Sequence, residues 1–131
     1  MNNNSVISNP TRKGDKRSIL VVDDDAKILR FVRWSLRLAG YEVITATDGE
    51  DALLIMEARK PDLIVLDIVM PGMDGFEVLR RIRVDEDTPV IAFSTHSSFK
   101  EQALRLGAND FLAKPFFPCE LLKRIGVLLQ N

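Results

Sequence analysis

Cysteine is almost absent from this chain: Cys119 is the only one among 131 residues, so no disulfide can form within the molecule. A single thiol suits a reducing compartment. Long apolar runs are also missing, since none exceeds the length of a strand, and the N-terminus carries no apolar signal core. These absences predict a cytoplasmic protein with no membrane partner.

An excess of either charge is missing as well. The chain has 18 Lys and Arg against 19 Asp and Glu, a net charge of −1, so composition predicts no direct nucleic-acid partner. The 46% of hydrophobic residues suffices for the core of one domain. Residues 1–17 are rich in Asn, Ser, Lys and Arg without hydrophobic periodicity, and we expect them to form a flexible extension.

One stretch organises the rest of the sequence: residues 63–75, LIVLDIVMPGMDG. Its unbroken run of branched aliphatic residues predicts a strand buried on both faces, and Pro71, Gly72 and Gly75 then force a loop. Asp67 ends that strand. A buried carboxylate is costly unless it is paired, so we expect partners for Asp67 from other parts of the chain.

Four further strand-like segments alternate with helical patterns. The expected strands cover residues 18–22, 41–46, 89–93 and 109–113, and the expected helices cover residues 26–39, 49–58, 74–82, 99–106 and 121–129. Five strand–helix units predict an α/β fold: a doubly wound, five-stranded parallel sheet with helices on both faces and right-handed crossovers. A ligand crevice is expected at the carboxyl ends of its strands.

Polar residues stand at the ends of four of these strands. Asp23 and Asp24 follow the first strand, Asp67 ends the third, Ser94 follows the fourth and Lys114 follows the fifth. Each of these residues alone has an ordinary explanation as a cap or a surface charge. Because the carboxyl ends of parallel strands share one edge of the sheet, we expect all five to meet on one rim, which indicates a site.

The residue types define the chemistry of this rim. Asp67 cannot stay ionised beside Asp23 and Asp24 without a cation, so the three carboxylates predict Mg²⁺ or Mn²⁺, with the backbone carbonyl of Val69 as a further ligand. A carboxylate so placed can act as a nucleophile and form an aspartyl phosphate. The ion and Lys114 would neutralise the oxygens of a transferring phosphoryl group.

Other polar residues have plainer interpretations. Asp25 is placed to cap the helix that starts at residue 26, and Asp74 has Glu77 three residues on, the capping-box spacing. We therefore interpret both aspartates as helix caps.

The helix expected at residues 26–39 has a basic side. It carries Lys27, Arg30, Arg33 and Arg37 with Trp34 among them. A solvated basic face is the default interpretation, and a partner-docking surface is the alternative, because an exposed Trp beside Arg is typical of interface anchors.

Taken together, these motifs resemble a known family. VVDDD, VLDIVMPGMDG, a Ser after an aliphatic strand, and KPF at residues 114–116 are similar to the receiver domains of two-component response regulators. The resemblance covers roughly residues 18–130, and we expect residues 18–131 to form one receiver domain. It implies a flavodoxin-like sheet with the strand order 2-1-3-4-5 that chemotaxis receivers have.

The resemblance also implies roles for single residues. Asp67 would accept phosphate from the phosphohistidine of a sensor histidine kinase or a phosphotransfer protein. Ser94 would be the switch hydroxyl, Lys114 the conserved lysine of the family, and Phe111 the switch aromatic. Movement of Ser94 toward the phosphoryl group would let Phe111 turn inward and remodel the face formed by the fourth helix, fifth strand and fifth helix, where a downstream protein partner binds.

Three positions depart from the usual pattern of the family or tune its chemistry. Thr95 stands where the family commonly has Ala or Gly, and its bulk is expected to narrow the path to Asp67. Val69 and His96 occupy positions that tune hydrolysis of the aspartyl phosphate, although His96 is more often a passive residue of the rim.

Several functional alternatives stay open. The chain is either a single-domain regulator or the receiver part of a longer one with a DNA-binding or enzymatic output domain, and its oligomeric state is open, including a dimer that forms on phosphorylation. A metal-dependent phosphatase or a nucleotide-binding domain has similar architecture. Against nucleotide binding, no glycine-rich loop follows the first strand. Against a turnover enzyme, the sequence offers no clear general acid, so we expect no enzymatic activity beyond self-phosphorylation and slow self-dephosphorylation.

Overall fold

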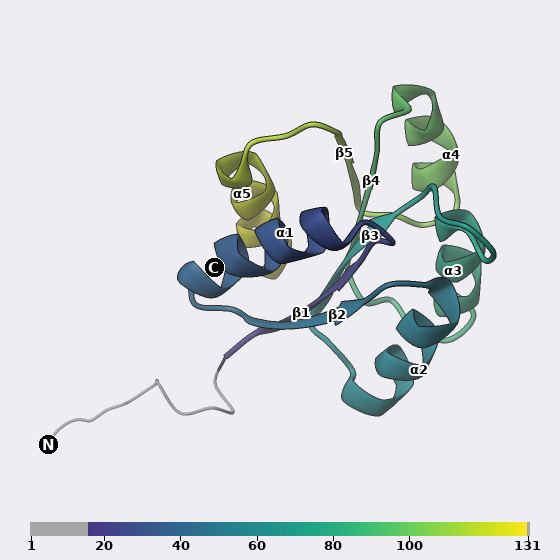
Figure 1. Ribbon diagram of the computed structural model, residues 1–131. Helices are drawn as coiled ribbons and strands as arrows, with labels where there is room; N and C mark the ends of the chain where they lie inside the picture. The colour runs from purple at the N-terminus through teal and green to yellow at the C-terminus, as the bar shows by residue number, and fades with distance from the viewer. Residues whose placement is uncertain (1–15, 131) are drawn as a thin grey trace, which may run out of the picture.

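The structure is a computed structural model and describes residues 16–130 (Figure 1). Its strands are β1 (Ser18–Val22), β2 (Glu42–Ala46), β3 (Leu63–Asp67), β4 (Val90–Ser94) and β5 (Asp110–Ala113). Its helices are α1 (Ala26–Leu38), α2 (Gly49–Arg59), α3 (Gly75–Ile82), the 3₁₀ turn η2 (Ser97–Phe99), α4 (Lys100–Arg105) and α5 (Pro118–Leu129).

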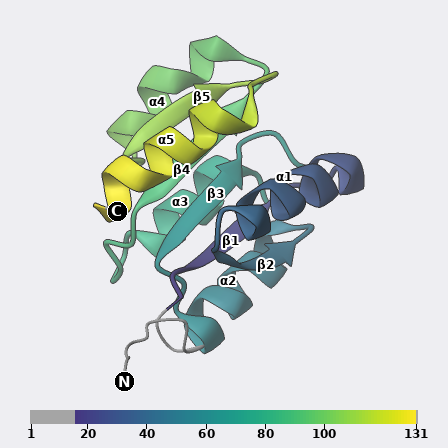
Figure 2. The ribbon, with the colours of Figure 1, turned by 90° about the vertical axis from the view of Figure 1, so that its left-hand side faces the viewer.

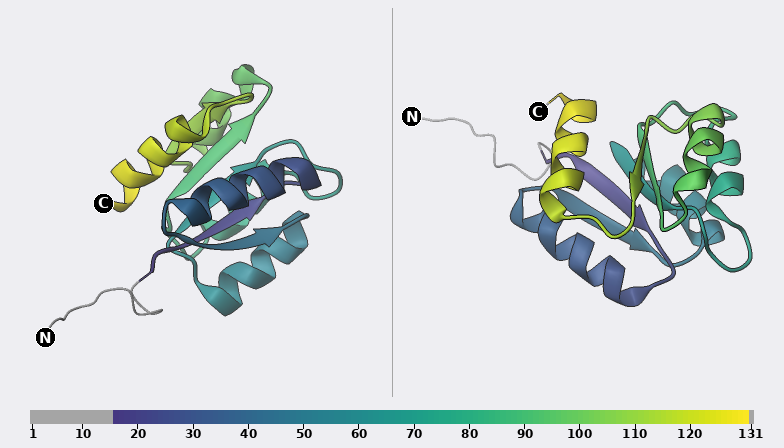
Figure 3. Two further views of the ribbon diagram at one scale, coloured as in Figure 1. Left: turned by 60° about the vertical axis from the view of Figure 1, so that its left-hand side comes forward. Right: turned by 90° about the horizontal axis from the view of Figure 1, so that it is seen from above.

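The strands form one parallel sheet in the order β2-β1-β3-β4-β5, which confirms the predicted fold class and strand order. Helices α1 and α5 lie side by side on one face, as Figures 2 and 3 show, and α2, α3 and α4 cover the other face. The sheet is thus the middle of three layers, and both of its faces are removed from water.

The core explains why the sequence forms this sheet. Every residue of β3 and β4 is buried, as expected for strands that read as continuous apolar runs. Apolar side chains that point to opposite faces of the sheet separate into two clusters, one under α1 and α5 and one under α2, α3 and α4. The strand that ends at Asp67 is therefore buried on both faces, as predicted, and the strand order makes it the middle strand of the sheet.

The helix starts agree with the predicted caps. The Asp25 carboxylate accepts from the backbone N–H of Lys27 at 2.9 Å, and the Asp74 carboxylate accepts from that of Glu77 at 2.9 Å. The reciprocal half of the capping box does not form, because the Glu77 carboxylate pairs instead with Arg80 and Arg81. Both aspartates are helix caps. Asp74 and Glu77 have the spacing of a capping box but form only one of its two hydrogen bonds.

Several boundaries differ from the expected ones. Helix α1 ends at Leu38, so Ala39 is an exposed cap residue and not part of the apolar stripe. The expected helix at residues 99–106 begins with the turn η2, and β4 extends to Ser94. The expected flexible extension falls largely on residues 1–15, outside the described residues, whereas the Arg17 carbonyl already accepts from Glu42 at 3.0 Å. Among residues 16–130, no helix has the length and apolar character needed to cross a bilayer.

Candidate functional site

The carboxyl ends of four strands bring the predicted site residues to one rim. Asp23 directly follows β1, Asp67 and Ser94 are the last residues of β3 and β4, and Lys114 directly follows β5. Parallel register aligns these ends, since Asp67 is level with Phe93 and Ser94 is level with Ala113. The chain therefore delivers side chains to one place from positions up to 91 residues apart.

Lys114 connects the two buried carboxylates. Its Nζ lies 3.0 Å from Asp23 Oδ2 and 3.4 Å from Asp67 Oδ1, and its side chain is only 13% exposed. The ammonium also sits over the ring of Phe93, 4.5 Å from the ring centroid, an attractive cation–π arrangement. The predicted convergence of the first acidic pair, Asp67 and Lys114 is thus present in the structure.

The acidic residues form a group that suits a divalent cation. Asp23, Asp24 and Asp67 each offer a carboxylate oxygen, and these oxygens lie within 4.8 Å of one another. Asp23 is completely buried and Asp67 nearly so, whereas Asp24 faces solvent. Hard cations such as Mg²⁺ prefer carboxylate oxygens and keep some of their waters, so one exposed and two buried carboxylates fit such an ion.

The protonation of Asp67 reflects this crowded environment. Burial, above all, and then the neighbouring charge of Asp23 raise the pKa of Asp67 from 3.8 to about 7, although Lys114 acts in the opposite direction. One ammonium therefore compensates two buried carboxylates only in part. A bound cation would supply the missing positive charge.

Ser94 is buried at the same rim, and its hydroxyl has donor capacity to spare. Its Oγ accepts from the backbone N–H of His96 at 3.0 Å, and within residues 16–130 no acceptor lies in hydrogen-bonding range of its proton. Phe111 is 5% exposed and packs in the cluster that includes Ala92 and Ala103. The predicted switch residues thus lie on neighbouring strands, one at the rim and one in the core.

The remaining residues singled out in the sequence lie around the rim. Thr95 and His96 are exposed and their side chains contact each other at 3.2 Å, and the His96 ring lies on that of Phe99 with 5.2 Å between centroids. The Val69 side chain is half exposed, and its backbone N–H points to Asp67 Oδ1 at 3.4 Å. The narrowing of the path to Asp67 by Thr95 and the binding of a cation by the Val69 carbonyl stay predictions.

Sequence reasoning missed Gly75 as a residue of the site. A Cβ at this position would overlap the carbonyl oxygen of Asp67 and would lie 2.6 Å from the Cα of Ile68. Its N–H donates to the Ile68 carbonyl at 2.8 Å. The absence of a side chain lets the first turn of α3 rest on the end of β3, and the only signal in the sequence was a glycine next to the capping Asp74.

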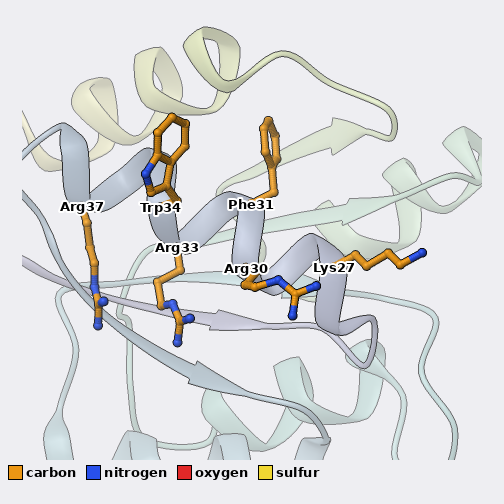
Figure 4. A pocket seen from close by; sticks show the side chains of 6 residues that line it. All are labelled: Lys27, Arg30, Phe31, Arg33, Trp34 and Arg37. Atoms are coloured by element: carbon orange, nitrogen blue, oxygen red, sulfur yellow. The ribbon is translucent and has the colours of Figure 1, made fainter.

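The exposed side of α1 also adjoins the site. Phe31 and Trp34 are 47% and 64% exposed, and Figure 4 shows both rings on one side of the helix with Arg33 and Arg37 on the other. A pocket of about 320 Å³ next to this side is mainly apolar and reaches Lys114, with a lining of Ile28, Phe31, Val32, Thr95, Lys114, Pro115 and Phe116. A partner on α1 would therefore stand next to the rim.

Comparison with known proteins places this geometry in a family. Residues 19–126 match the family model described as the response regulator receiver domain. Two of the solved structures that resemble the chain are the receiver domain of Francisella response regulator 1452 (TM-score 0.83, 35% identity, 88% of this chain and 98% of that chain) and the chemotaxis protein CheY4 of Vibrio cholerae (TM-score 0.80, 36% identity, 86% and 98%).

Curated relatives are longer proteins. The probable transcriptional regulator ycf27 of Cyanophora paradoxa is 43% identical over 119 residues, 89% of this chain and 50% of that protein. The transcriptional regulatory protein PrrA of Mycobacterium tuberculosis is 45% identical over 116 residues, 86% of this chain and 50% of that protein. The chain spans about half the length of these relatives. The match of the family model over most of the sequence confirms the resemblance, and the chain belongs to the response regulator receiver domain family.

Proposed function

We propose that Asp67 accepts a phosphoryl group from a phosphohistidine of a sensor histidine kinase or phosphotransfer protein, in a reaction that requires Mg²⁺ or Mn²⁺. The observation that carries this proposal is the position of the Lys114 ammonium, within 3.4 Å of both buried carboxylates. Receiver domains interact with such phosphodonors, and they are generally not enzymes acting on other substrates.

The chemistry follows from the groups on the rim. A carboxylate oxygen of Asp67 attacks phosphorus, the P–N bond to the donor histidine breaks, and the imidazole leaves after taking up a proton. The cation, held by Asp23, Asp24, Asp67 and the Val69 carbonyl, would supply positive charge at the phosphoryl oxygens. Lys114 would also supply positive charge at the phosphoryl oxygens, because its Nζ already lies beside the nucleophile.

Phosphorylation would change the conformation of the domain through Ser94 and Phe111. The spare hydroxyl proton of Ser94 can donate to a phosphoryl oxygen, and this contact exists only after transfer. Moving a domain from mostly inactive to mostly active takes a difference of about 5 kcal/mol, which a few charge-assisted hydrogen bonds can supply. We infer that packing against Ala92 and Ala103 favours the buried position of Phe111, since its ring has no hydroxyl that would need a partner.

The phosphodonor protein would dock on the exposed side of α1. Phe31 and Trp34 offer apolar anchors there, and the apolar pocket between α1 and the loop after β5 reaches Lys114. Trp34→Ala is expected to slow transfer from a phosphohistidine protein at least tenfold. The same variant should leave labelling by acetyl phosphate unchanged, and equal slowing with both donors would contradict docking on α1.

The decisive experiment is incubation with acetyl phosphate and Mg²⁺, followed by intact mass measurement and peptide mapping. We expect one phosphoryl group, confined to Asp67, that is absent with a chelator and in Asp67→Asn. Label on another residue, or label that survives chelation, would refute the proposal. Continuous release of phosphate from p-nitrophenyl phosphate would favour the phosphatase alternative.

The relatives bear on the output of this domain. Relatives of about twice this length are named transcriptional regulators, so the predicted lack of a direct nucleic-acid partner is not confirmed. We propose that phosphorylation changes the face formed by α4, β5 and α5, through which the domain binds a separate partner, a second copy or an attached output domain.

A further inference from the structure

The outer edge of β2 carries main-chain groups that no strand of the described residues uses. Within residues 16–130, β2 is an edge strand and pairs with β1 alone. The N–H of Glu42 and the carbonyl of Ala46 bond inward, at 3.0 and 3.1 Å. Because alternate residues of a parallel strand bond to the same neighbour, Val43 and Thr45 direct their N–H and C=O groups outward. Among residues 16–130, no strand pairs with this side of the sheet.

A groove of about 570 Å³ runs along this edge, and its charge is strongly positive. Among residues 16–130, four cations line it, and Glu42 is the only carboxylate that does. The lining within these residues is Lys16, Arg33, Arg37, Tyr41, Glu42, Val43, Ile44, Thr45 and Arg59. In the described part of the chain, only Arg59 has a carboxylate near it, that of Glu42 at 4.0 Å. This concentration is local, because the net charge of the chain is −1.

The cations flank both faces of the edge strand. Arg33 and Arg37 come from α1, on one face of the sheet, and Arg59 comes from α2, on the other. Figure 4 shows Arg33 and Arg37 on the side of α1 that is opposite Phe31 and Trp34. Any extended chain alongside β2 would therefore place successive side chains next to arginine, whichever face each side chain points to.

We propose that this edge binds an acidic, extended polypeptide segment of a partner protein, which adds a strand to the sheet next to β2. The outward groups of Val43 and Thr45 would supply main-chain hydrogen bonds, and Arg33, Arg37 and Arg59 would select carboxylates. A segment that matches the five residues of β2 is roughly 17 Å long. This surface is separate from the phosphoacceptor rim and does not depend on the proposed phosphotransfer.

A nucleic acid would match the groups of this groove less well than a peptide would. A phosphate backbone could pair with the arginines, but it has no regular alternation of donors and acceptors to match the main chain of an edge strand. A peptide uses both the cations and the strand edge. A bound peptide should therefore protect the amides of Val43 and Thr45 from hydrogen exchange, whereas a bound nucleic acid should not.

The test uses the full chain and a fluorescein-labelled nonapeptide in which Asp or Glu alternates with Val or Thr. We expect saturable binding by fluorescence anisotropy, and at least tenfold weaker binding for the double variant Arg33→Gln/Arg37→Gln. The control Lys100→Gln/Lys123→Gln removes the same charge from exposed positions on α4 and α5 and should bind the peptide normally. Far-UV circular dichroism and urea denaturation serve as checks that each variant is folded.

Hydrogen exchange separates strand addition from simple charge attraction. Saturating peptide should slow the amide exchange of Val43 and Thr45 at least tenfold and leave β5, the opposite edge of the sheet, unchanged. Binding without this protection would overturn the proposal. So would tighter binding of a single-stranded oligonucleotide of equal charge, or a tenfold gain in peptide affinity after removal of residues 1–15, since the chain's own segment would then be the occupant.

Discussion

Ionised Asp67 should destabilise the protein when no divalent cation is bound. Its pKa is raised from 3.8 to about 7, mainly by burial. Between these values the folded protein holds a proton that the unfolded chain releases, so the free energy of unfolding falls as pH rises, and it falls no further above about pH 7. At about 1.4 kcal/mol per pKa unit, the cost at pH 8 is up to about 4 kcal/mol.

The variant Asp67→Asn removes this cost while keeping the shape of the side chain. In the presence of a chelator at pH 8, we expect its free energy of unfolding to be about 2 to 4 kcal/mol higher than that of the wild type. This corresponds to a rise in Tm of roughly 10 °C. The advantage should shrink to about two fifths at pH 5 and to a small fraction at pH 4, and vanish below about pH 3, where both folded and unfolded wild type hold the proton.

Urea denaturation across pH 4 to 8 measures this directly. Asp85→Asn is the matched control: Asp85 is exposed and this variant keeps Asp67, so its stability should follow that of the wild type at each pH. Mg²⁺ at about 100 times its Kd should stabilise the wild type by about 2.7 kcal/mol and Asp67→Asn by less. Equal stability of wild type and Asp67→Asn at pH 8, or a gain in Asp67→Asn that is as large at pH 4 as at pH 8, would refute the reasoning.

Three further substitutions test single contacts. Thr95→Ala should speed labelling by small phosphodonors by widening the path to Asp67, and equal rates would contradict this role. Phe111→Ala should keep phosphorylation but lose the phosphorylation-dependent change in amide exchange of α4 and β5, with a loss of about 3 to 5 kcal/mol in stability; an unaltered response would count against a switch role. Gly75→Ala should lower the free energy of unfolding by about 1 to 3 kcal/mol and slow labelling, because its Cβ overlaps the end of β3. Gly126→Ala, with open space around its Cβ, is the control that should be neutral or mildly stabilising.

Much of this architecture was predictable because it depends on patterns that are local in the sequence. The aliphatic run before Asp67 could form only a strand buried on both faces, and β3 is buried throughout. Once five such strands are parallel, their carboxyl ends share an edge. The approach of Lys114 to Asp23 therefore follows from topology and needs no local signal linking residues 91 positions apart.

What could not be predicted depends on the exact approach of elements that are distant in sequence. The contact between Gly75 and the end of β3 is fixed by how α3 packs, and the position of Lys114 over Phe93 is fixed by the path of the chain after β5. The positive groove along β2 arises because α1 and α2 place arginines on opposite faces of one edge strand. Each of these features brings together residues that no local sequence pattern links.

The surroundings of the two buried carboxylates favour Asp67 over Asp23 as the proposed nucleophile. Both oxygens of Asp23 are engaged, one by the backbone N–H of Asp25 at 2.8 Å and the other by Lys114 Nζ at 3.0 Å. Asp67 meets Lys114 and the Val69 N–H through a single oxygen, each at 3.4 Å. Since hydrogen bonds to a carboxylate oxygen occupy the lone pairs it would use in attack, the reactivity of Asp23 is reduced. The oxygen of Asp67 that makes neither contact keeps its lone pairs, and burial raises the pKa of Asp67 above that of an ordinary carboxyl, which makes its ionised form more basic than an ordinary carboxylate.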